Sequence, residues 1–275
     1  MKNAMQLKQL IRNLAKDSNI EAEVLLRSFM MERFLERVAL SDYKHNFILK
    51  GGVLIASMIG VDARTTKDID VAIKGYVLSK ERVVAIVEEL TQVPVADEVK
   101  FLYVGIEEIR EESDYPCFRV KVDATFDRVR QVLKIDISAK DFIAPAEIEY
   151  SYQLLFEDRA INLLAYNLEL VLAEKFETII ARGTVNTRMR DFYDIYALTA
   201  ICNFDEKIFS TALERTAKNR DTADQVEKSA EIIAMLCESP IMANLWERYK
   251  KKYPYAADIS WDMVMSSVRD LANCA

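Results

Sequence analysis

The chain has 275 residues, of which 51% are hydrophobic and 29% are charged, and its formal net charge is −7. Such a chain can bury the core of one large domain or of two closely packed ones, and it is neither a disordered protein nor a generally basic nucleic-acid binder. The sequence shows neither a charged-then-apolar leader nor an apolar run of membrane-spanning length, so we expect a cytoplasmic protein with no membrane partner.

Residues 1–45 are predicted to form an N-terminal helical segment. Ser18 and Glu21 have the spacing of a capping box ahead of a second helix, in which apolar residues recur at helical spacing. Three basic residues recur four apart in the first helix: Lys8, Arg12 and Lys16. Their shared face is either solvated or a contact surface for a partner, and the sequence leaves both open. The only histidine, His45, precedes the first strand, where a surface or capping role is expected.

A diglycine follows the first predicted strand, Phe47 to Leu49. Gly51 and Gly52 permit backbone angles and a close approach that a Cβ atom would forbid. A short apolar helix comes next, and its free N–H groups are expected to face an anion such as phosphate. A diglycine taken alone is usually only a turn.

Two carboxylates share one face of the next strand, Asp68 to Ile73. The alternation points Ile69 and its apolar neighbours into the core, and it leaves Asp68 and Asp70 on the other face, about 6.6 Å apart at ~3.3 Å per residue. Two hard oxygen donors of this kind suit Mg²⁺, whereas the four scattered cysteines and single histidine do not suggest a zinc site.

A helix from Leu78 to Leu90, with Ser79 as its cap, leads into a second group of strands. Residues 118–126 alternate strictly, residues 127–130 are predicted to be a hairpin loop, and the following strand places Asp136 on the outer face. Asp136 is a candidate third carboxylate, and Asp123 is its rival. In the alternative interpretation, Asp136 only forms a cross-strand pair with Lys121.

The second half is predicted to be almost wholly helical after a further hairpin at residues 147–164. Helices at residues 168–182 and 188–201 flank a break, and together they form an αα-hairpin. This hairpin carries Ala173-Glu174-Lys175, then Arg182, then Arg190-Asp191-Phe192-Tyr193-Asp194. Without further information, these charges describe two helices joined by salt bridges.

Taken together, the motifs resemble the polymerase-beta-type nucleotidyltransferases and in particular the AbiEii toxin family. The family signature is K-G-G, a short helix and R-x-[ST]-x-D-x-D, followed later by A-E-K, a downstream arginine and [KR]-D-x-x-D. The chain matches it in order, beginning with Lys50-Gly51-Gly52 and Arg64-Thr65-Thr66-Lys67-Asp68-Ile69-Asp70. Val53 departs from it, because a small residue, often Thr or Ser, commonly follows the diglycine.

The resemblance implies an α/β (α+β) fold: a nucleotidyltransferase-like core with a mixed sheet at residues 46–165, preceded by the N-terminal helices 1–45 and followed by a helical C-terminal domain at residues 166–275. It implies an enzyme that moves a nucleoside monophosphate from an NTP to a hydroxyl, as the toxin partner of a cognate antitoxin. The acceptor that it favours is RNA, at the 3′ end of tRNA. A small-molecule nucleotidyltransferase and a degenerate, non-catalytic NTP-binding module stay open.

The resemblance also assigns roles to individual residues. Asp68, Asp70 and Asp136 would hold Mg²⁺, with Asp136 favoured over Asp123. Gly51 and Gly52 would cradle phosphates, Thr66 would contact one or be modified, and Lys175 with Arg64 and Arg190 would hold the triphosphate. Asp191 and Asp194 would orient these basic groups or contact the nucleoside.

Residues 203–275 carry no further motif, and helices are expected at residues 225–236 and 261–271. Within them, WERYKKKYPY at residues 246–255 alternates basic and aromatic residues. Lys250, Lys251 and Lys252 are predicted either to meet an RNA backbone while nearby tyrosines stack on a base, or to be the ordinary basic end of a helix.

Overall fold

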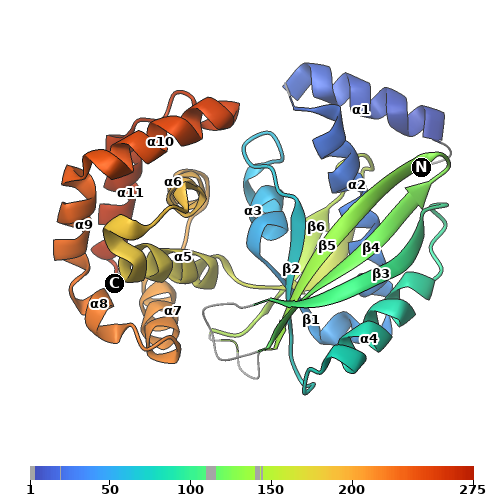
Figure 1. Cartoon of the computed structure of the whole chain (residues 1–275), viewed down its shortest axis with the longest axis horizontal. Helices are drawn as coiled ribbons and strands as arrows, with labels where there is room; N and C mark the ends of the chain where they lie inside the picture. The colour runs from blue at the N-terminus through green and yellow to red at the C-terminus, as the bar shows by residue number, and fades with distance from the viewer. Residues whose placement is uncertain (1–3, 19, 110–115, 140–142, 144) are drawn as a thin grey trace. The chain divides into compact units, whose positions relative to one another are not determined.

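The computed structural model describes residues 4–18, 20–109, 116–139, 143 and 145–275. The chain divides into two compact units, which are described separately here (Figure 1). Unit 1 comprises Met1–Ile143 and Glu147–Tyr166, and unit 2 comprises Ala144–Ala146 and Asn167–Ala275. Within the described part of the chain, every helix is too short or too polar to cross a membrane.

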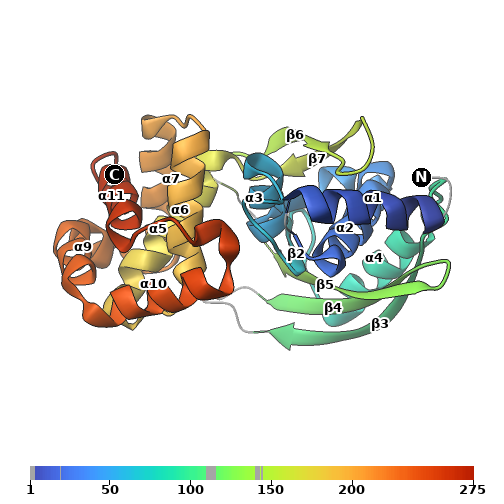
Figure 2. The ribbon, with the colours of Figure 1, turned by 90° about the horizontal axis from the view of Figure 1, so that it is seen from above.

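Unit 1 is built on a seven-stranded sheet with the order β3-β4-β5-β2-β1-β7-β6. The strands are β1 (Phe47–Lys50), β2 (Asp68–Ile73), β3 (Lys100–Ile109), β4 (Cys117–Phe126), β5 (Val129–Ala139), β6 (Ile148–Gln153) and β7 (Ala160–Ala165). The pairs β1–β7 and β2–β5 are parallel and the others are antiparallel, which confirms the predicted mixed sheet. Figure 2 shows β3 and β6 at opposite edges of the unit.

The helices of unit 1 are α1 (Ala4–Ser18), α2 (Ala22–Leu40), α3 (Gly51–Ile59) and α4 (Lys80–Gln92), with a 3-10 turn, η1, at Asp42–His45. The long helix α2 contacts β5 and β7, and α4 contacts β3 and β4 (Figure 1). The apolar positions of the strands, such as Val120, Val122, Leu133 and Ile135, are fully buried. The alternate positions of β4 and β5, which lie on the opposite face, carry most of the charged residues of these strands.

Helix capping follows the sequence prediction at one helix and departs from it at another. The Ser79 hydroxyl accepts a hydrogen bond from the Arg82 N–H, so the predicted cap of α4 is confirmed. The predicted capping box is wrong. Ser18 is instead the last residue of α1, where its hydroxyl donates to the Leu14 carbonyl at 2.6 Å, and Glu21 caps α2 without a side-chain hydrogen bond.

The β4–β5 hairpin turns one residue earlier than predicted. Phe126 pairs with Val129, so the turn contains only Asp127 and Arg128, and Asp127 adopts a φ of 53°. Moving the centre of a turn by one residue moves every cross-strand partner by two positions but leaves each side chain on its own face. The predicted pairing of Lys121 with Asp136 is therefore wrong.

A buried carboxyl group links α2 to the loop between β6 and β7. The Glu32 carboxylate accepts the Leu155 N–H at 3.0 Å, and among the described residues its second oxygen has no hydrogen-bond partner. Burial raises the pKa of Glu32 to about 8, although the Leu155 N–H, Arg33 and Arg159 favour the charged form and Glu157 opposes it. Burial therefore favours the protonated form of Glu32 in the folded protein.

Unit 2 is helical. Its helices are α5 (Leu168–Arg182), α6 (Met189–Ile201), α7 (Glu206–Asn219), α8 (Ala223–Glu227), α9 (Ser229–Glu238), α10 (Pro240–Lys252) and α11 (Trp261–Ala272). Helix α5 has its predicted bounds and begins where the Asn167 side chain accepts the Leu170 N–H at 2.8 Å. The single helix predicted at residues 225–236 is wrong, because the chain leaves helical geometry at Lys228 and forms α8 and α9 instead.

Candidate active site

Four charged residues form one row across the middle of the sheet in unit 1. Lys50 of β1 pairs with Asp70 of β2, Asp70 with Asp136 of β5, and Asp136 with Arg119 of β4. Asp68 lies two residues before Asp70 on the same face, since the intervening Ile69 is fully buried. The sheet therefore brings all three predicted metal-binding carboxylates to one face, with a cation at each end of the row.

Asp70 is the most constrained of the three. One of its oxygens accepts the Gly52 N–H at 3.2 Å. Burial raises the pKa of Asp70; Lys50 and the Gly52 N–H counteract this, whereas the charges of Asp136 and Asp68 add to it. The N–H that was predicted to be free for an anion is thus already used by a carboxylate.

Each of the two glycines is required for a different steric reason. Gly51 has a φ of 64°, and a Cβ atom on it would lie 2.2 Å from the Asp70 Oδ2 atom. A Cβ atom on Gly52 would lie 2.4 Å from the Thr66 hydroxyl oxygen and 2.7 Å from an Arg64 guanidinium nitrogen. Helix α3 begins on Gly51 itself, so the diglycine is the first turn of the helix rather than a loop ahead of it. The side chains that follow in the motif fill the space that these glycines leave.

Arg64 and Thr66 are held by backbone carbonyls, one in the loop before β2 and one at the first residue of β2. The Arg64 side chain is 3% exposed and donates to the Thr65 carbonyl at 2.9 Å. The Thr66 hydroxyl donates to the Asp68 carbonyl at 3.3 Å. In this arrangement both side chains support the diglycine and β2, and their assignment to phosphate stays a prediction.

Asp136 is bound by a residue that the sequence motifs did not single out. Arg119 donates to both of its oxygens, from Nε at 2.8 Å and from Nη2 at 2.7 Å. The rival carboxylate, Asp123, is bound instead to Arg130 and lies two rows from Asp70. The signal that could have found Arg119 is the hairpin register, because any turn centred between residues 127 and 128 places Arg119 opposite Asp136.

The remaining predicted residues lie in unit 2. The Lys175 ammonium is 2.7 Å from an oxygen of Asp191 and 2.7 Å from one of Asp194. Both carboxylates are buried, and Arg188 also lies 2.9 Å from Asp191. The two carboxylates on α6 therefore fix the position of Lys175 on α5, as the salt-bridge interpretation required.

Arg190 is turned toward a tyrosine. Its Nη2 atom donates to the Tyr253 hydroxyl at 2.9 Å, and its guanidinium lies 5.3 Å from the centre of the Tyr253 ring. Tyr253 in turn contacts Tyr249 and Tyr255, whose hydroxyls are 2.9 Å apart. Tyr249 is only 7% exposed, so its ring is part of the packing of unit 2 and cannot stack on a base.

Comparison with protein families settles the kind of protein that carries these residues. Residues 33–267 match the family described as nucleotidyl transferase AbiEii toxin, type IV toxin–antitoxin system. The chain belongs to the AbiEii family. The resemblance seen in the motifs is confirmed over most of the chain.

Solved structures share the fold of this AbiEii-family chain at low sequence identity. MenT4, a nucleotidyltransferase toxin from Mycobacterium tuberculosis H37Rv, is 16% identical with a TM-score of 0.56, over 96% of this chain and 94% of that one. JHP933 from Helicobacter pylori is 14% identical with a TM-score of 0.50, over 93% and 91%. Among curated proteins, none matches the sequence significantly.

The three carboxylates of this AbiEii-family chain can be judged as a metal site by their chemistry and by their geometry. Three hard oxygen ligands on one face are the donor set that Mg²⁺ prefers, so the residues fit the ion chemically. However, within the described ranges, no three His, Cys, Asp or Glu side chains are gathered closely enough to hold a metal. Arg119 donates one hydrogen bond to each oxygen of Asp136, which leaves a further lone pair on each oxygen for a cation.

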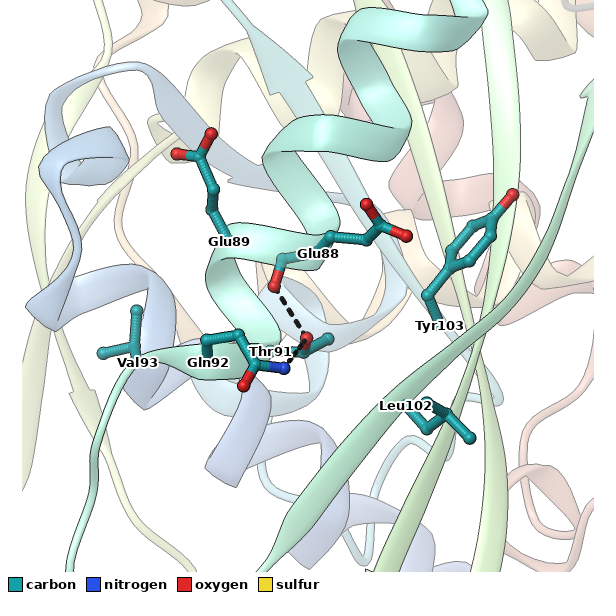
Figure 3. A pocket seen from close by; sticks show the side chains of 7 residues that line it. All are labelled: Glu88, Glu89, Thr91, Gln92, Val93, Leu102 and Tyr103. Atoms are coloured by element: carbon teal, nitrogen blue, oxygen red, sulfur yellow. Dashed lines mark hydrogen bonds between the residues drawn. The ribbon is translucent and has the colours of Figure 1, made fainter.

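A pocket of about 580 Å³ lies elsewhere in unit 1 of the AbiEii-family chain, between the end of α4 and β3. Figure 3 shows its lining: Glu88, Glu89, Thr91, Gln92, Val93, Leu102 and Tyr103. The Thr91 hydroxyl donates to the Glu88 carbonyl at 2.7 Å and accepts from Gln92 at 3.2 Å. No predicted site residue lines this pocket, and its side chains do not converge on a common point.

Proposed function

We propose that this AbiEii-family toxin transfers a nucleoside monophosphate from an NTP to a hydroxyl of RNA, at the 3′ end of tRNA, with Mg²⁺ as its cofactor. The observation that supports this best is the pairing of Asp70 with Asp136 on adjacent strands, with Asp68 on the same face. Carboxylates that lie side by side repel each other, and this repulsion destabilises the folded protein. A bound cation neutralises their charge and removes the repulsion.

Asp68, Asp70 and Asp136 are the residues that would hold the ion. When bound, Mg²⁺ neutralises charge on the phosphates and sharpens the acceptor oxygen for in-line displacement. Arg119 and Lys50 orient the carboxylates from either end of the row. Gly51 and Gly52 allow the start of α3 to approach Asp70 closely.

Lys175 is proposed to hold the triphosphate through charge-assisted hydrogen bonds. Its two ion pairs support a defined position for the ammonium, because each carboxylate restricts the long side chain. Asp191 and Asp194 are then positioning residues that act through Lys175, and Arg190 is positioned by Tyr253.

One observation favours a second function. Arg119 binds both oxygens of Asp136, and a protein that binds NTP without catalysis has no need for that carboxylate to be available. A non-catalytic NTP-binding module is therefore the alternative to be tested against transfer.

The two functions differ in whether label is transferred. The protein is incubated with each α-labelled NTP and Mg²⁺, together with either total tRNA or a panel of small hydroxyl compounds. We expect label on RNA, lost with chelator and with Asp70→Asn but kept with Asp258→Asn, a change at an exposed aspartate of unit 2. NTP binding without any label would establish the alternative, and label confined to small molecules would overturn the RNA acceptor.

A further inference from the structure

The outer face of the β3–β4–β5 ribbon carries four basic residues that the proposed chemistry does not use. Lys121 of β4 pairs with Lys134 of β5, and farther along the ribbon Thr125 pairs with both Arg130 and Lys100. We call these four the basic ladder: Lys100, Lys121, Arg130 and Lys134. Three of them are exposed and Lys121 is half-buried, so each ammonium or guanidinium can reach solvent.

The ladder begins beside the carboxylates. Lys134 is the cross-strand partner of Asp68, two residues from Asp136 on the same strand and face. At about 3.3 Å per residue, the Lys121–Lys134 row therefore lies roughly 6.6 Å from the Asp70–Asp136 row. An anion held between these lysines would be next to the proposed site of transfer.

Lys121 and Lys134 are like charges placed directly opposite each other, an arrangement that destabilises a sheet. Lys121 is partly neutralised by Glu107 at 3.4 Å. Among the residues that the structure describes, none forms an ion pair or hydrogen bond with the Lys134 ammonium. Lys121 and Lys134 therefore repel each other across the strands, and an anionic ligand held between them would relieve that repulsion.

Exposed aliphatic side chains lie between the two basic rows. Val132 of β5 and Leu102 of β3 flank Asp123 in the intervening row and are 46% and 67% exposed. Asp123 itself is bound to Arg130, so its charge is already compensated. The face thus alternates basic groups with apolar surface, which suits a ligand that has both phosphates and flat apolar rings.

We propose that the basic ladder binds the single-stranded 3′ end of the acceptor RNA and leads its terminal hydroxyl toward Asp68, Asp70 and Asp136. This rests on the proposed function and specifies where its acceptor lies. The phosphate nearest the terminal hydroxyl lies between Lys121 and Lys134, and the preceding backbone continues toward Arg130 and Lys100. Val132 and Leu102 contact the sugars and bases.

The lysines at the end of α10 are the rival surface that the sequence suggested. Lys250 forms an ion pair with Glu247 at 3.1 Å, and the Lys252 ammonium lies 5.4 Å from the centre of the Tyr253 ring. Tyr253 is itself engaged by Arg190. Lys250 and Lys252 thus each have a partner within unit 2, whereas Lys134 of the ladder forms no ion pair or hydrogen bond with a described residue.

The test compares three sets of lysine-to-glutamine changes in the full chain. The ladder variant is Lys121→Gln/Lys134→Gln, the rival is Lys250→Gln/Lys251→Gln/Lys252→Gln, and the matched control is Lys207→Gln/Lys218→Gln on exposed positions of α7. Binding of total tRNA and of a single-stranded RNA oligonucleotide is measured between 50 and 200 mM salt. NTP affinity is measured separately by the NTP-dependent shift in melting temperature.

For the ladder variant, we expect the salt slope to fall by about 1.4, at ~0.7 per lost single-strand phosphate contact, which is an affinity loss of about 25-fold at 0.1 M salt. The control should bind as the parent does, and NTP affinity should be unchanged in both. The ladder variant should melt at or above the temperature of the parent, because the like-charge pair is removed.

Three results would overturn the proposal: RNA binding of the ladder variant equal to that of the control, a loss seen only in the rival variant, or a loss of NTP affinity in place of RNA affinity. Failure of the proposed function is a separate outcome. If the parent binds RNA through the ladder but labels none, the surface stands and the acceptor is wrong. If the parent labels RNA and the ladder variant does so equally, only the surface is wrong.

Discussion

Gly51→Ala should destabilise unit 1 strongly, because two separate costs act at this residue. Its φ of 64° lies in the left-handed region, which alanine enters at a cost of about 1–2 kcal/mol. The new Cβ atom would also lie 2.2 Å from Oδ2, 2.6 Å from Cγ and 2.7 Å from Cβ of Asp70. All three atoms are too close, so the Asp70 side chain must move as a whole and its bond with the Gly52 N–H is lost.

Overpacking of this kind typically costs ~1–3 kcal/mol, so the total loss of unfolding free energy is on the order of 2–5 kcal/mol. At about 2–4 °C per kcal/mol for a unit of this size, the melting temperature should fall by roughly 4–20 °C. Thermal unfolding followed by circular dichroism measures this directly, without any assumption about activity.

Gly105→Ala is the matched control, since no atom of the described residues lies within 4 Å of its added Cβ atom and its φ is not positive. It should change stability by less than ~0.5 kcal/mol. Gly51→Ala/Asp70→Ala separates the two costs, because removing the Asp70 carboxylate relieves the nearest overlap but leaves the backbone strain. Equal melting temperatures for Gly51→Ala and Gly105→Ala would refute the close approach of Gly51 to Asp70.

Three further changes test the carboxylates, the lysine and the buried acid. Asp70→Asn should abolish transfer while the melting temperature in chelator stays at or above that of the parent, because a partly buried charge is removed; turnover close to that of the parent would contradict the metal assignment. Lys175→Ala should lower NTP use and also cost about 3–5 kcal/mol, since it removes the ammonium that lies between two buried carboxylates. Adding Asp194→Asn to it should recover part of the stability but not NTP use, and recovery of both would mean that Lys175 is only structural. Glu32→Gln should flatten the pH dependence of unfolding: the folded pKa of about 8 lies above the ordinary 4.5, so the parent loses stability as pH rises between these values. Urea unfolding at pH 5, 7 and 8.5 measures that slope, and an equal slope in parent and variant would exclude a protonated Glu32.

Local patterns in the sequence were sufficient to predict most helices and strands and the face of the sheet on which each side chain lies. The alternation in β2, β4 and β5 placed Asp68, Asp70, Asp123 and Asp136 on the face opposite the buried apolar residues, and the structure agrees. The predicted bounds of α5 agree with the structure, in which Asn167 and Gly183 cap the two ends of the helix, and such capping is a local effect. The order of the motifs was also sufficient to identify the family, because a family signature consists of residue types and their spacing.

Cross-strand partners depended on the tertiary structure. A shift of one residue in the β4–β5 turn keeps every side chain on its face, so the hydrophobic pattern does not distinguish the two registers. The partner of Asp136 nevertheless changes from Lys121 to Arg119. Asp127 in the turn adopts a φ of 53°, and this marks the place where the chain reverses.

The close approach of Gly51 to Asp70 and the clustering of Lys175 with Asp191 and Asp194 were likewise decided by packing. The members of each group are 16 to 19 residues apart in sequence and meet only when a helix folds back on a strand or on another helix. Spacing can show that charges share a face, but whether they bind one another or stay available for a ligand depends on the three-dimensional distance between the elements that carry them.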